Sequence, residues 1–234
     1  MKRLIEAISI WTKDLVDLLF PRRCCVCEGP LSTGENDICE DCLADLPLTY
    51  FWDWAQNPAF ERMVRHAPVE AAASLFFFRE EAGYNHILHS IKYLGRKELG
   101  RRMGRLLGEK LSSSRQFAGI DAVVPVPLHP LRRWKRGYNQ AEIIAEEVAR
   151  ALGKPLLTDL LRRQRRTRTQ TRLSGEAKAR NVRGAFAPGK GVYPAVKHIL
   201  LIDDVLTTGA TLGECAATLM PGFRISVASL AFVG

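Results

Sequence analysis

The fold of this chain is decided by the stretch Ile199-Leu-Leu-Ile-Asp-Asp-Val-Leu-Thr-Thr-Gly-Ala-Thr211. Its first four residues form a continuous apolar run, which is typical of a strand buried on both faces of a parallel sheet. Residues 210–220 then have the pattern of a helix, whose N-terminus would face the end of that strand. We therefore expect an α/β fold with a mostly parallel central sheet and a ligand site at the carboxyl edge of this strand.

The polar part of this stretch has the chemistry of a site for a phosphorylated sugar. Asp203 and Asp204 are expected at the carboxyl end of the strand, and Gly209 lets the backbone turn tightly around an anion. No Gly-Lys-Ser/Thr follows this glycine, so the segment is not a lysine-bearing P-loop. A buried strand with an acidic turn and a threonine-capped helix is the weaker interpretation, because it leaves the paired carboxylates and three threonines unexplained. The loop consists of Thr207, Thr208, Gly209, Ala210 and Thr211.

Charge is distributed unevenly along the 234 residues, whose formal net charge is +9. Residues 1–60 contain five Lys/Arg against ten Asp/Glu, whereas residues 162–183 contain nine Lys/Arg and one Glu. A basic second part suits diphosphate or nucleic acid, although such a run can equally be a solvated face. No apolar run approaches the length of a membrane span, so we expect no integral membrane segment.

The N-terminal segment, residues 1–20, predicts an amphipathic helix and not a secretory signal. Charged residues interrupt it, and it lacks both an apolar core and a small-residue cleavage site. Without a signal we expect a cytoplasmic protein, in which the helix docks on the protein itself or on a partner. The apolar residues of its face are Leu4, Ile8, Trp11, Leu15, Leu18 and Leu19.

Cysteine spacing predicts a structural zinc site. Cys24-x-x-Cys27 and Cys39-x-x-Cys42 are two knuckles that together supply a tetrahedral Cys₄ shell. Disulfides fit a reducing compartment poorly, and a thioredoxin-like pair needs only one knuckle. Cys25 and Cys215 are expected to be free, the latter as a small core residue.

The middle of the chain predicts the remaining elements of the sheet domain. Residues 43–70 are expected to be a connector without regular structure, and residues 71–78 a strand. One or two helices follow over residues 84–111, with breaks at Gly95 or Gly100. A strand over residues 121–127 and a helix over 138–152 flank a basic loop. The expected units are an N-terminal helix (1–20), a zinc ribbon (21–50), a connector (51–70) and a sheet domain (71–234), which the resemblance described next identifies as phosphoribosyltransferase-like.

The stretch 199–211 resembles the 5-phosphoribosyl-1-pyrophosphate (PRPP) motif of the type I phosphoribosyltransferases. The resemblance implies that Asp203 and Asp204 contact the ribose hydroxyls, that residues 207–211 cradle the 5-phosphate, and that magnesium accompanies the diphosphate. The basic loop after the strand at 121–127 repeats this architecture with opposite charge and stands where the diphosphate loop belongs. Its cations are Arg132, Arg133, Lys135 and Arg136.

A wider set of motifs, from about Phe20 to the end of the chain, resembles the ComF/GntX family. This resemblance implies a zinc ribbon joined to a type I phosphoribosyltransferase domain, with a role in bacterial natural competence. It would place the protein on the cytosolic side of DNA import, at the inner face of the membrane through partners, near single-stranded DNA and a competence helicase. Besides the cysteines and the PRPP motif, the set comprises Lys92-Tyr-x-Gly95, Pro125-Val-Pro-Leu-His129, Arg136-Gly-x-Asn-Gln140, Gln170-Thr-x-Leu-Ser174 and Asn181-Val-x-Gly-Ala-Phe186.

The segment 162–183 has no apolar periodicity and is expected to be a mobile loop. It stands where many phosphoribosyltransferases close a loop over their substrate. It could also be an arm that follows a single DNA strand, with stacking on Tyr138 or Trp134, or a solvated insertion. Its closely spaced arginines are Arg165, Arg166, Arg168 and Arg172.

Three functions remain open at this stage. The leading one is a PRPP-binding competence factor that handles single-stranded DNA. The second is an active phosphoribosyltransferase that modifies a base or an amine, although no acceptor pocket and no catalytic residue can be named from the sequence. The third is a zinc-dependent nucleic-acid adaptor with an idle PRPP pocket.

Overall fold

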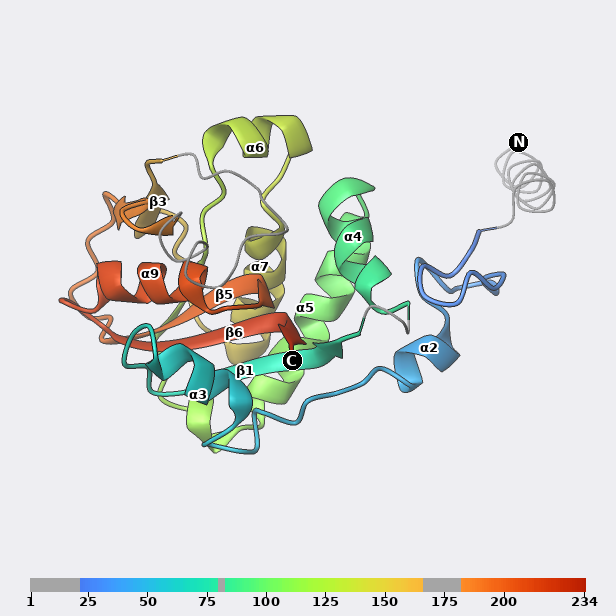
Figure 1. Cartoon of the computed structure of the whole chain (residues 1–234), viewed down its shortest axis with the longest axis horizontal. Helices are drawn as coiled ribbons and strands as arrows, with labels where there is room; N and C mark the ends of the chain where they lie inside the picture. Colours follow the sequence, from blue (N-terminus) through green and yellow to red (C-terminus); the bar gives the residue numbers. More distant parts are fainter. Residues whose placement is uncertain (1–21, 80–82, 166–181) are drawn as a thin grey trace, which may run out of the picture.

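A four-stranded parallel sheet, in the order β1-β6-β5-β2, forms the centre of the larger part of the molecule (Figure 1). The strands are β1 (Ala72–Phe78), β2 (Ala122–Pro125), β5 (His198–Leu206) and β6 (Arg224–Val233). β5 lies between β6 and β2, so its apolar residues Ile199 to Ile202 are fully buried. This confirms the expected α/β fold. The structure is a computed structural model and describes residues 22–79, 83–165 and 182–234.

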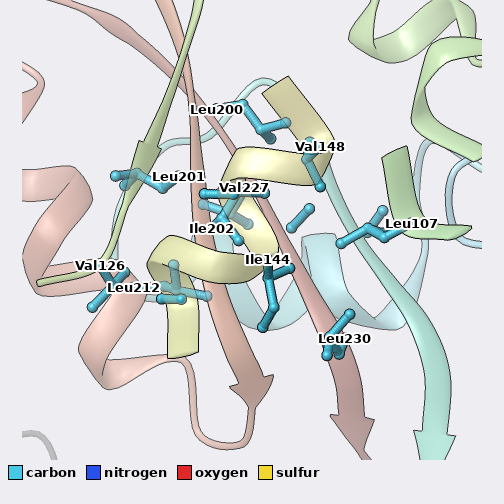
Figure 2. Packing of buried hydrophobic residues seen from close by; sticks show 14 of the residues in the cluster. Leu107, Val126, Ile144, Val148, Leu200, Leu201, Ile202, Leu212, Val227 and Leu230 are labelled. Carbon is cyan, nitrogen blue, oxygen red and sulfur yellow. The ribbon is translucent and has the colours of Figure 1, made fainter. Parts of the chain in front are cut away.

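Helices cover both faces of the sheet (Figure 1). α5 (Lys97–Ser112) and α7 (Gln140–Leu152) pack against one face. α3 (Pro58–Val64) and α9 (Ala210–Leu219) pack against the other. Figure 2 shows part of the core, where Ile144 and Val148 of α7 lie over Ile202 of β5. This three-layer arrangement leaves the carboxyl ends of the strands as the open edge.

Close contact between α5 and α7 depends on glycine. A Cβ atom at Gly104 would lie 2.9 Å from the carbonyl oxygen of Ile144, and one at Gly108 would lie 2.7 Å from the Cβ of Ala151. Gly100 lies inside the same helix, so our prediction of a break there was wrong. The break falls at Gly95, which has a φ of +70° and separates α4 (Asn85–Tyr93) from α5.

Two segments predicted to be irregular contain helices that begin at proline. Pro58 starts α3 inside the expected connector, and the side chain of Asn57 caps it by accepting hydrogen bonds from the N–H groups of Ala59 and Phe60. The expected basic loop is helix α6 (Pro130–Arg136), which His129 caps in the same way. Proline is favoured at the first position of a helix, so Pro58 and Pro130 both fit the helices that they begin.

The remaining elements lie at the ends of the molecule. β3 (Leu161–Arg163) and β4 (Phe186–Pro188) form a separate antiparallel pair, so the start of the expected loop at 162 is a strand. η1 (Arg115–Phe117) is a short 3₁₀ turn, and α2 (Glu40–Ala44) belongs to the cysteine module. The expected helix at 1–20 lies outside the described residues. In the part of the chain that the structure describes, no helix combines the length and the apolarity of a membrane span.

The cysteine module contacts the sheet domain near the start of α5. Asp37 of the module pairs with Arg96 at 3.0 Å between oxygen and nitrogen. The hydroxyl of Tyr84 donates to the carbonyl oxygen of Asp45 at 3.0 Å. Gly83 approaches the module so closely that a Cβ atom there would lie 2.4 Å from the carbonyl oxygen of Val26. The module therefore packs on the same side of the molecule as α4 (Figure 1).

Candidate functional site

The two adjacent aspartates lie in the second half of β5. The strand continues through Asp203 and Asp204 to Leu206, two residues further than the aspartates themselves. Because successive side chains of a strand point to opposite faces, the carboxylates meet different neighbours. Asp204 is buried on the side of α7, whereas Asp203 is partly buried near α9 and β3. The pair is therefore two distinct carboxylates and not one symmetric dyad.

Asp204 is held by groups from two other elements. The Nζ atom of Lys92 in α4 lies 3.0 Å from Oδ2 of Asp204, and the Nε2 atom of Gln140 in α7 donates to the same oxygen at 3.0 Å. Burial disfavours the charged form of Lys92, but the attraction of Asp204 outweighs it and raises the pKa of Lys92. Arg136 of α6 donates in turn to Oε1 of Gln140. Asp204 thus anchors α4, α6 and α7 at the end of β5.

The pKa of Asp203 is raised above the usual value of an aspartate. Burial and the neighbouring charge of Asp204 raise the pKa of Asp203 to about 7, against the opposing charges of Lys92 and Arg163. Arg163 reaches this position from β3, with its guanidinium carbon 5.1 Å from the ring centre of Phe186. Burial and the charge of Arg132 lower the pKa of Arg163. A carboxyl that titrates near neutral pH beside an arginine is characteristic of a functional site.

The loop after β5 presents backbone donors at a helix N-terminus. Gly209 has a φ of +83° and caps the start of α9, a ten-residue helix. The backbone N–H groups of Thr207, Thr208 and Gly209 have no acceptor in the described part of the chain. Free N–H groups at the positive end of a helix dipole are a binding site for an anion such as phosphate.

Helix α3 fixes the orientation of this loop from behind. Arg62 donates to the carbonyl oxygen of Thr207 at 2.5 Å, and Nε2 of His66 lies 2.6 Å from that of Thr208. Arg62 also donates to the carbonyl of Val233 and lies over the ring of Phe232, 4.1 Å from its centre. In a trans peptide the N–H points away from the C=O. Fixing these two carbonyls toward α3 therefore turns the N–H groups of Thr208 and Gly209 away from it.

Glycine is required where α3 meets the loop. A Cβ atom at Gly209 would lie 2.8 Å from Cδ2 of His66, and one at Gly213 would lie 2.4 Å from Cβ of His66. Sequence reasoning missed Arg62 and His66, because they belong to the segment that was expected to be irregular. It also missed the roles of Lys92 and Gln140, although both residues stand in the motifs of the family resemblance.

The predicted diphosphate cations divide into two groups. Arg132 and Arg136 are partly buried, one near Arg163 and the other against Gln140. Arg133 and Lys135 are exposed, and Arg133 pairs with Glu142 at 3.3 Å. Of the four loop arginines, Arg165 donates to the carbonyl oxygen of Arg183 at 2.5 Å. The others, Arg166, Arg168 and Arg172, lie outside the described residues, as does the motif 170–174.

The four predicted zinc ligands converge. The Sγ atoms of Cys24, Cys27, Cys39 and Cys42 all lie within 4.8 Å of one another, and those of Cys27 and Cys39 are 3.8 Å apart. With Zn–S bonds of about 2.3 Å, a tetrahedron has S–S edges of about 3.8 Å. All four cysteines are free of disulfides, so the thiolates are available to the metal.

Backbone donors support thiolate character at Cys24. The N–H groups of Val26 and Cys39 each lie 3.4 Å from Sγ of Cys24. Burial opposes the thiolate, but such backbone hydrogen bonds outweigh it and lower the pKa of Cys24 to about 7. Burial raises the pKa of Cys25 to about 12, which agrees with its expected place outside the metal shell. The cluster is thus a zinc ribbon suited to one structural zinc ion, which would close all four coordination positions.

Comparison with known proteins supports both parts of the chain. Residues 15–50 match the family model described as a double zinc ribbon domain. The chain is 28% identical over 222 residues to competence protein F of Haemophilus influenzae, which covers 86% of this chain and 91% of that protein. It is also 28% identical over 221 residues to DNA utilization protein YhgH of Escherichia coli K12, covering 87% and 92%. The chain is a homologue of these proteins.

A third relative extends the comparison to a more distant bacterium. Competence protein ComFC of Bacillus subtilis is 34% identical over 112 residues, which is 47% of this chain and 43% of that protein. The names of these relatives and the zinc ribbon confirm the resemblance to the ComF/GntX family that the motifs indicated.

Proposed function

We propose that this protein binds PRPP at the carboxyl edge of β5 and acts in the uptake or use of DNA, handling single-stranded DNA on the cytosolic side of the membrane. The observation that carries the PRPP part is the loop 207–209, whose backbone N–H groups lack acceptors among the described residues while α3 fixes two of its carbonyls. The DNA part is supported by the names of the relatives, competence protein F and DNA utilization protein YhgH.

Different residues at this edge would bind different parts of the PRPP molecule. The 5-phosphate would accept from the N–H groups of Thr208 and Gly209 and from the threonine hydroxyls. Asp203 would accept from the ribose hydroxyls. The diphosphate would lie toward Arg132 and Arg163.

Magnesium, when bound with PRPP, neutralises charge on the diphosphate. Asp203 is the carboxylate that could hold it, because Asp204 already has two partners on Oδ2. We therefore assign Asp204 a mainly supporting role, with Oδ1 left for a ribose hydroxyl.

The DNA-related role would use the cations of the sheet domain and protein partners, of which a competence helicase is one. The formal charge of +9 supports an anionic partner. The zinc ribbon would contribute by its fold and not by charge, because residues 22–45 are rich in acidic side chains.

Calorimetric titration with PRPP and magnesium tests the ligand. We expect Asp203→Asn to weaken binding at least tenfold, since it replaces a charged acceptor of hydroxyl hydrogen bonds. Asp53→Asn is the matched control, because Asp53 is exposed and lies outside β5 and the loop that follows it. Equal affinity of the parent and Asp203→Asn would refute this assignment of the pocket.

Transfer of the phosphoribosyl group is the second candidate, and the protonation of Asp203 favours it. A carboxyl with a pKa of about 7 can accept a proton from an acceptor base at neutral pH. Release of diphosphate from PRPP in the presence of candidate bases or amines would establish the activity. Binding of PRPP without diphosphate release for any acceptor would leave the protein as a binding factor.

A further inference from the structure

The amino-acid composition of helix α6 is not explained by packing against the hydrophobic core. None of its seven residues is buried, four of them are Lys or Arg, and none is acidic. The helix is nevertheless well defined at both ends. His129 accepts from the N–H of Leu131 at 3.2 Å, and Gly137 closes the helix with a φ of +80°. Every side chain of this short, capped helix is therefore at least partly open to solvent.

Two exposed aromatic side chains lie on this helix and at the end of α4. Trp134 of α6 is 83% exposed, and Tyr93 at the end of α4 is 63% exposed. Arg136 joins the two helices, with its guanidinium carbon 5.4 Å from the ring centre of Tyr93. α4 and α6 stand at the same end of the molecule in Figure 1. We call this surface the α4–α6 platform; it consists of Tyr93, Leu94, Leu131, Trp134, Lys135 and Arg136.

The charge of the platform is positive. Arg133 is compensated by Glu142, and Lys92 beneath the platform is compensated by Asp204. Lys135 has no ion pair within the residues that the structure describes, and Arg136 is hydrogen-bonded to a neutral amide. Exposed rings beside cations match a ligand that offers both flat apolar faces and negative charge.

We propose that the α4–α6 platform binds single-stranded DNA by stacking bases on Trp134 and Tyr93 while Lys135 and Arg136 contact phosphates. The proposal rests on the proposed function in one respect, that the protein meets single-stranded DNA. Only an unpaired strand exposes base faces to such rings, because a duplex keeps them stacked inside. A lipid surface fits less well, since seven residues are too few for the broad apolar face of a membrane-surface helix.

This surface differs from the stacking site that the sequence indicated. Tyr138 was one of the two expected stacking residues, but it is buried and its hydroxyl donates to the carbonyl of Ile91. Lys97 already covers its ring, with Nζ 5.1 Å from the ring centre. Tyr93, the last residue of α4, takes its place as the second exposed ring.

Fluorescence anisotropy with a labelled thymidine 20-mer, on the zinc-loaded full chain over a salt series, tests the platform. Trp134→Ala should weaken binding about 5- to 100-fold with an unchanged salt slope, because it removes stacking and no phosphate contact. Lys135→Ala should flatten the slope of log K against log salt by about 0.7. Trp54→Ala is the matched control, since Trp54 is also exposed and stands just before α3, which lies at the opposite end of the molecule from α6 in Figure 1.

An abasic strand of the same length separates stacking from charge. The parent and Trp134→Ala should bind it equally, because it offers phosphates without bases. If the parent binds the 20-mer and Trp134→Ala binds it equally well, the platform is refuted while the DNA role survives. If the parent does not bind the 20-mer at all, the DNA role and the platform both fail. Loss of binding to anionic phosphatidylglycerol vesicles in Trp134→Ala, with unchanged DNA binding, would instead assign the platform to a membrane.

Discussion

Removing Lys92 should destabilise the protein by leaving Asp204 charged and unpaired. The side chain of Asp204 is 5% exposed and that of Lys92 is 21% exposed, so solvent does little to replace the lost partner. Breaking a buried ion pair from one side typically costs 3–5 kcal/mol. Because Gln140 still donates to Asp204, we expect about 3 kcal/mol for Lys92→Met.

A double-mutant cycle tests whether Lys92 and Asp204 form a buried charge pair. Asp204→Asn removes the charge that Lys92→Met leaves unpaired, so the double variant should be more stable than Lys92→Met alone by about 1–2 kcal/mol. Urea unfolding followed by circular dichroism at pH 7.5, with zinc retained, measures each free energy of unfolding.

An exposed ion pair serves as the control for this cycle. Arg101 pairs with Glu98 one turn away on α5, and Arg101→Met should cost less than about 0.5 kcal/mol. If Asp204→Asn fails to rescue Lys92→Met, the contact between Lys92 and Asp204 is not a buried charge pair, and the supporting role of Asp204 is wrong.

Three further predictions concern packing, metal and pH. Gly104→Ala should destabilise the protein by about 1–2 kcal/mol, because its Cβ would lie 2.9 Å from a carbonyl oxygen of α7; Gly100→Ala, with its nearest contact at 3.4 Å, should be neutral or stabilising by up to about 1 kcal/mol in the same urea assay. Cys39→Ser should reduce zinc below one ion per chain by elemental analysis, and full occupancy would contradict the Cys₄ site. Since the pKa of Asp203 is raised to about 7, the folded state binds its proton more tightly than the unfolded chain, and stability falls as pH rises from about 4 to 7. Asp203→Asn removes this loss, so the variant should be more stable than the parent at pH 8 with little difference near pH 4; a constant difference across this range would refute the shift.

The parts of the fold that could be predicted are those whose signal is local. The apolar run at 199–202 indicated its own buried strand, and the spacing of the four cysteines indicated their convergence, because each depends on a short piece of chain. The orientation of the phosphate loop could not be predicted in this way. It depends on Arg62 and His66, which lie more than 140 residues earlier, and only tertiary packing brings them to the loop.

Supporting groups around the aspartates show the same limit. Lys92, Gln140 and Arg163 come from three elements, and nothing in the sequence between them specifies that all three approach the end of β5. Proline begins both α3 and α6, and it is favoured at the first position of a helix, but the sequence prediction did not use this signal.

The contacts of α3 also determine how this protein can be divided for experiments. A fragment that began at residue 71, where the sheet domain was expected to start, would discard the guanidinium and the imidazole that hold the carbonyls of the loop. It would also lose Asn57, whose amide donates to the carbonyl of Ala72 at the first residue of β1. Such a fragment would be inactive because the loop has lost its contacts with α3, and its inactivity would say nothing about the zinc ribbon. A fair separation of the two parts starts the fragment at residue 46 or 47, after α2 and before the first of these contacts.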